Sequence, residues 1–105
     1  AYNDSLVSMN AAMTEALNAV IAERASVDEA VARLSAIYDR YEPAHLAFAD
    51  RLEAHLRHKA ATARNRRERD RYLARAEAEP AQVRATRANL EDVTRRSYTQ
   101  YLARR

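Results

Sequence analysis

Four arginines are spaced so that, on a single α-helix, their side chains fall in one row. They are Arg57, Arg64, Arg71 and Arg75, separated by seven, seven and four residues. Positions with these spacings share one face of a helix that has 3.6 residues per turn. A guanidinium group can bind phosphate or carboxylate through two parallel hydrogen bonds. The row is therefore the candidate site for an anion or for a partner molecule.

The segment that holds this row carries acids as well as bases. Residues 57–72 contain seven bases and two acids, a net charge of +5. On a helix, three opposite-charge pairs would lie three or four residues apart: Arg64–Glu68, Glu68–Arg71 and Arg66–Asp70. The favoured interpretation is a solvated helix crossed by these salt bridges. Binding of an anionic protein, a lipid or a nucleic acid is the alternative, although no base-reading motif accompanies the charge.

Other chemistry finds little support in the residue types. His55 and His58 are helix neighbours, and Glu42-Pro43-Ala44-His45 resembles one half of a carboxylate-bridged metal site, but the sequence lacks a second such pair. We therefore expect no metal and no cofactor. The chain has neither cysteine nor glycine, which excludes thiolate chemistry and the glycine-dependent phosphate loops and nucleophile elbows. We expect a protein that is not an enzyme.

The apolar residues predict that almost the whole chain is helical. They recur every seven residues at Leu6, Met13, Val20, Val27, Leu34, Tyr41 and Phe48. A second seam follows Val31, Tyr38 and Leu52. This pattern is typical of coiled coils and helical bundles. The predicted fold class is all-α: an antiparallel three- or four-helix bundle, compact or elongated, with coiled-coil-like heptad packing.

Capping residues and prolines mark the expected helix ends. Ser26-Val27-Asp28-Glu29 is a capping-box pattern, which starts a helix. Pro43 predicts a kink or a tight corner, because the heptad phase continues through it, and Pro80 predicts a true turn. The expected helices are 3–24, 26–41, 43–78 and 80–104, with the middle two either separate or joined as one kinked helix.

Length and charge limit the organisation of the chain. A chain of 105 residues predicts a single helical domain over 1–105. Four bases and eight acids give residues 1–52 a net charge of −4, whereas fourteen bases and seven acids give residues 53–105 a net charge of +7. No run approaches the roughly 20 apolar residues of a membrane helix, so no membrane span is expected. We expect a soluble protein, either cytoplasmic or exported after removal of a signal peptide.

These observations favour a non-enzymatic interaction or assembly module that binds a protein partner or itself through helix faces. Large aliphatic residues are scarce after Leu56, so the second half gains by burying its seams against another copy, and a homo-oligomer is expected. The alternative is a polyanion or nucleic-acid binder that uses the arginine-rich second half. A third possibility is a small-molecule sensor with a pocket between its helices.

Overall fold

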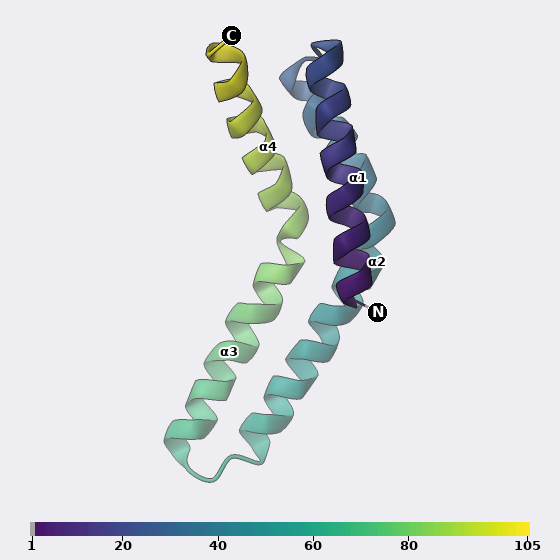
Figure 1. Ribbon diagram of the computed structural model, residues 1–105. Helices are drawn as coiled ribbons and strands as arrows, with labels where there is room; N and C mark the ends of the chain where they lie inside the picture. Colours follow the sequence, from purple (N-terminus) through teal and green to yellow (C-terminus); the bar gives the residue numbers. More distant parts are fainter. Residues whose placement is uncertain (1) are drawn as a thin grey trace. The chain divides into compact units, whose positions relative to one another are not determined.

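The computed structural model describes residues 2–105 and contains four α-helices (Figure 1). They are α1 (Tyr2–Glu23), α2 (Val27–Ala61), α3 (Arg66–Arg84) and α4 (Thr86–Ala103). No strand occurs among the described residues, so the expected all-α helical fold is confirmed.

The helices form two compact units. The first contains the chain up to Pro43 together with Thr86–Arg105, and the second contains Ala44–Ala85. The first unit therefore combines α1, the beginning of α2 and α4, whereas the second is a hairpin of the rest of α2 with α3. A single domain over 1–105 stays a prediction, and so does heptad packing of the coiled-coil kind.

The connection between α1 and α2 is built without glycine. The amide of Arg24 donates to the carbonyl of Ile21 at 3.2 Å, and the amide of Ala25 donates to the carbonyl of Val20 at 3.1 Å. This is the Schellman pattern, which places one residue in the left-handed region. Arg24 takes that position with a φ of 55°, and it is the one non-glycine residue with positive φ among residues 2–105.

The start of α2 confirms Ser26 as the residue that caps the helix, which is the first half of the expected capping box. The Glu29 carboxylate accepts from Arg33 at 2.8 Å. The amide of Glu29 donates to the Ser26 Oγ at 3.1 Å, which satisfies one of the free amides at the helix start. The helix then continues through Pro43, an exposed position, as far as Ala61. The predicted helix 26–41 and the first part of the predicted helix 43–78 are therefore one helix.

The predicted helix over 43–78 is wrong at its centre. The chain leaves the helix after Ala61 and enters α3 at Arg66. The physical reason is the side chain of Asn65, whose oxygen accepts a hydrogen bond from the Glu68 amide and begins a new helix there.

The predicted turn at Glu79-Pro80 is also wrong. Pro80 lies inside α3 and is buried, and the break comes at Ala85, between α3 and α4. The predicted helix 80–104 accordingly begins late, at Thr86. Proline removes the hydrogen bond that its nitrogen would give to the carbonyl of Ala76. Burial of both residues offsets this loss, because Ala76 and Pro80 belong to the interior of the hairpin.

The core of the first unit contains a buried tyrosine of α4 that is hydrogen-bonded to the α1–α2 connection. Tyr98 is 3% exposed, and its hydroxyl donates to the Ala25 carbonyl in the α1–α2 connection at 2.6 Å. Val20 and Ala30 are fully buried in the same cluster. The Tyr98 hydroxyl thus ties α4 to the α1–α2 connection and gives a hydrogen-bond partner to a carbonyl that lies outside both helices.

The heptad seam of α2 supplies buried residues to both units. Val31, Leu34, Tyr38 and Tyr41 are buried in the first unit. In the second unit the buried positions are His45, Ala49, Leu56 and Ala60. From Ala49 onward, burial comes one residue later than a continued heptad requires, because a straight helix drifts relative to a seven-residue repeat.

Leu34→Ala should lower the free energy of unfolding by about 2–5 kcal/mol, because it leaves a cavity where a fully packed side chain stood. Leu52, expected to be equally buried, is only half-buried, so Leu52→Ala should have a clearly smaller effect. Urea denaturation followed by circular dichroism measures both. Equal losses in the two variants would contradict the burial described here.

Arg24→Gly should stabilise the protein by about 1 kcal/mol, because an L-residue loses roughly 1–2 kcal/mol in the left-handed region and glycine does not. Arg24→Ala is the matched control, since it removes the charge but keeps the β-carbon. Thermal denaturation of the three proteins distinguishes the effects. A glycine variant no more stable than the alanine variant would show that the Schellman turn carries no strain.

Candidate anion-binding site at the α2–α3 turn

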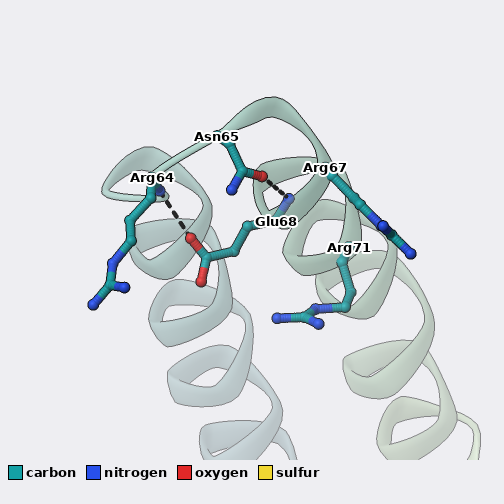
Figure 2. A pocket seen from close by; sticks show the side chains of 5 residues that line it. All are labelled: Arg64, Asn65, Arg67, Glu68 and Arg71. Atoms are coloured by element: carbon teal, nitrogen blue, oxygen red, sulfur yellow. Dashed lines mark hydrogen bonds between the residues drawn. The ribbon is translucent and has the colours of Figure 1, made fainter.

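Residues 62–65 form a short turn held by side chains. Thr62 Oγ1 donates to the His58 carbonyl at 3.0 Å and so caps the end of α2. Asn65 Oδ1 accepts from the Glu68 amide at 2.9 Å, and the Glu68 carboxylate accepts from the Arg64 amide at 2.8 Å (Figure 2). The two reciprocal bonds bind the turn to the first turn of α3.

An open pocket of about 490 Å³ lies over this turn. Its lining consists of Arg64, Asn65, Arg67, Glu68 and Arg71. Figure 2 shows Arg64 and Arg67 extending to opposite sides of the turn, with Arg71 between them. The lining therefore presents three guanidinium groups and one carboxylate, and that carboxylate is already bound to the backbone.

Five cations around the turn have no acidic partner among residues 2–105. We call them the basic tip: Lys59, Arg64, Arg66, Arg67 and Arg71. Within residues 2–105, none of the five lies within ion-pair distance of a carboxylate. Residues 59–71 contain one more cation, Arg69, whose guanidinium lies 3.4 Å from the carboxylate of the neighbouring Asp70. All five side chains of the basic tip are exposed.

This result corrects the expected salt-bridge pattern of the strip. Glu68 was expected to pair with the side chains of Arg64 and Arg71, but its carboxylate binds the Arg64 amide. Asp70 was expected to pair with Arg66 but meets Arg69. The reason is that the helix starts at Arg66, so Arg64 lies outside it and offers Glu68 a backbone amide. The strip is less neutralised by ion pairs than its sequence predicts.

Elsewhere in the described chain most arginines are ion-paired. Of the twelve cations outside residues 59–71, seven contact carboxylates: Arg33, Arg57, Arg75, Arg84, Arg87, Arg95 and Arg96. Two of these arginines contact two acids of a neighbouring helix, and each does so within one unit.

Arg87 is the more enclosed of the two. Its guanidinium contacts Asp39 and Glu42, donates to the Ser35 carbonyl at 3.1 Å, and lies 5.1 Å from the centre of the Tyr38 ring. These contacts join α4 to α2 inside the first unit, so Arg87 contributes to the packing of these two helices.

Arg84 does the same in the hairpin, with Asp50 at 2.9 Å and Glu53 at 2.8 Å. Hydrogen bonds from Arg84 and Arg57 hold the pKa of Glu53 below its ordinary value of 4.5. A carboxyl group with a lowered pKa supports the folded state above its unfolded-state pKa. That support is lost as the pH falls through the lowered value, so acid should loosen the α2–α3 pairs.

The predicted row of four arginines is divided by the turn. Arg57 belongs to α2 and pairs with Glu53 at 3.0 Å, and Arg75 belongs to α3 and pairs with Glu79 at 2.6 Å. Arg64 and Arg71 do come together, in one pocket. The row as a whole stays a prediction. Its members differ in pairing: Arg57 and Arg75 contact carboxylates, whereas Arg64 and Arg71 line the pocket.

The row of four arginines predicted on one continuous helix includes neither Arg66 nor Arg67. Arg67 lines the same pocket as Arg64 and Arg71. The signal that could have found it is the sequence Asn65-Arg66-Arg67-Glu68, which has the spacing of a capping box and marks a helix start.

The other candidate groups lie elsewhere. His45 is 2% exposed inside the hairpin, whereas His55 and His58 are exposed. Among the described residues, no group of three metal-ligating side chains comes together. Tyr38, which lies on the second apolar seam, and Tyr98 are both buried.

Comparison with known proteins adds no relative. The chain matches no protein-family model, no curated protein and no solved structure. Within residues 2–105, none of the helices combines the length and the apolar composition required to cross a membrane.

Asn65→Ala should lower the free energy of unfolding by about 1 kcal/mol, because it removes the side chain that caps α3. Asn65→Asp keeps an acceptor at the same place and should stay within a few tenths of a kcal/mol of the parent. Chemical denaturation of both variants gives the difference. If the aspartate variant lost as much as the alanine variant, the cap would not account for the turn.

Proposed function

We propose that this chain is a non-enzymatic interaction module that binds an anionic partner through the basic tip. The observation that carries the proposal is the contrast in pairing. Eight of the thirteen other cations contact acids, whereas Lys59, Arg64, Arg66, Arg67 and Arg71 have no carboxylate within reach in the described chain.

The electrostatics of the tip support a binding task. Like charges close together repel one another and destabilise the fold that gathers them. Arginines that connect two helices reduce this repulsion by pairing with acids, as Arg84 and Arg87 do. In the basic tip, the same relief must come from solvent ions or from a bound anion. A polyanion would release those ions when it binds, which supplies free energy for association.

A second candidate is association with a protein partner or with another copy through helix faces. The observation that favours it is the exposure of apolar side chains in the first unit, with Val7 of α1 at 70% and Val93 of α4 at 52%. Light scattering across a concentration series tests it, and a monomer at every concentration would argue against self-association.

The basic tip is tested by removing charge there and, in equal amount, elsewhere. The triple variant Arg64→Gln, Arg67→Gln, Arg71→Gln should elute from immobilised heparin at clearly lower salt than the parent, because three contacts to the polyanion are lost. The three side chains are exposed and make no ion pair within the described chain, so the melting temperature of the variant should stay close to that of the parent.

The matched control changes three exposed arginines that also lack an acidic partner in the described chain: Arg40, Arg51 and Arg104. The control Arg40→Gln, Arg51→Gln, Arg104→Gln has the same net charge as the tip variant and should elute near the parent. If both variants shifted equally, heparin would be sensing net charge alone, and the proposed role of the tip would be wrong.

A further inference from the structure

The chemistry of the basic tip also points to the kind of anion it takes. Resting on the proposed function, we infer that the partner is a double-stranded nucleic acid, held by its phosphate backbone without reading of the bases. Three features of the turn lead to this ligand: its lack of apolar anchors, the placement of its cations, and the state of its aromatic ring.

The first feature is the absence of any large apolar side chain in the tip. From Arg57 to Arg71, the sequence holds no apolar residue larger than alanine. Interfaces between proteins are anchored by apolar and aromatic side chains in a desolvated centre, where charged groups are depleted. Interfaces with nucleic acids are more polar and much more positively charged. The composition of the tip matches the second kind.

The second feature is the placement of the guanidinium groups on two sides of the turn. Arg64 and Arg67 extend in opposite directions, and Arg71 lies between them (Figure 2). A duplex presents two rows of phosphates that flank a groove, so cations on both sides of one turn can each meet a row. A flat lipid surface would meet the cations of one side. The arrangement therefore fits a grooved polyanion better than a planar one.

The third feature is the state of the aromatic side chain next to the tip. Binding of single strands relies on aromatic rings on which bases stack. Tyr72 is half-buried, and the guanidinium groups of Arg71 and Arg75 lie 5.6 Å and 5.8 Å from the centre of its ring. Two guanidinium groups therefore already contact this half-buried ring, where a base would have to stack. The protein would then contact the phosphates alone, and a duplex carries more phosphates per unit length than a single strand does.

Glu68 gives this inference a sharp test. Its carboxylate lies in the pocket among the arginines and accepts the Arg64 amide at 2.8 Å. Glu68→Gln keeps an oxygen that can accept the same hydrogen bond but removes a negative charge that opposes phosphate. A site for phosphates should therefore bind more tightly in this variant, and the gain should fade as salt screens the charges. A purely structural role for Glu68 predicts no gain.

The experiment is a fluorescence-anisotropy titration of the parent, the tip variant, its charge-matched control and Glu68→Gln with a short labelled DNA duplex of mixed sequence. We expect the tip variant to bind about tenfold or more weakly and to lose up to about 2.7 from the log–log salt slope, at ~0.9 per phosphate contact. The control should bind like the parent, Glu68→Gln more tightly, and a single strand of equal length no more tightly than the duplex.

Two competing probes separate the failure of this inference from the failure of the proposed function. Tighter binding to poly-glutamate or to phosphatidylserine-containing vesicles than to the duplex, lost in the tip variant, would overturn the nucleic-acid ligand and leave the basic tip as an anion site. Binding to the duplex that is equal in the parent and in the tip variant would overturn the inference as well. Loss of the heparin difference would overturn both.

Discussion

The lack of glycine is the constraint on which the rest of this structure depends. A helix end leaves backbone groups without partners, and glycine is the usual means of closing it. This chain uses side chains instead: Ser26 starts α2, Asn65 starts α3, and Arg24 takes a left-handed conformation after α1. The two units exist because these positions allow the chain to reverse. The turn of the hairpin is polar because polar side chains close it: Thr62, Asn65 and Glu68 each bond to a backbone group there.

Arginine occurs in two kinds of surroundings among the described residues, and the acids nearby distinguish them. Where helices lie side by side within a unit, Arg84 and Arg87 each contact two carboxylates of α2. Where the hairpin turns, the acids are occupied differently, because Glu68 holds the backbone of the turn. The arginines at the turn therefore stay without ion pairs partly because the nearby Glu68 carboxylate is bound to the backbone. A count of charges alone would treat both places alike.

The helical class and the start of α2 could be predicted from the sequence because local signals agreed there. The capping box at Ser26 comes just before an apolar seam, so both signals mark the same boundary. The equivalent pattern at Asn65 stands among arginines, which favour helix and share a seven-residue spacing, and the boundary was therefore missed. Pro80 misled for the opposite reason, since burial in the hairpin outweighs its local preference.

The candidate site was only partly predictable from the sequence. Arg64 and Arg71 belong to the pocket as well as to the predicted row, but Arg67 joins them only because the helix begins at Arg66. Pairing was harder to foresee, because Asp50 lies 34 residues before Arg84, and Glu42 and Asp39 lie 45 and 48 residues before Arg87. Spacing rules for one helix cannot supply such contacts.

The composition of the first unit has a consequence for the order of events during synthesis. This unit needs α4, whose Tyr98 reaches a carbonyl of the α1–α2 connection 73 residues earlier. The hairpin, by contrast, is continuous in the sequence and can close as soon as α3 has left the ribosome. Until α4 follows, the apolar faces of α1 and of the beginning of α2 remain partly uncovered. The nascent chain is therefore open to chaperones at α1 and at the beginning of α2 while α4 is being made.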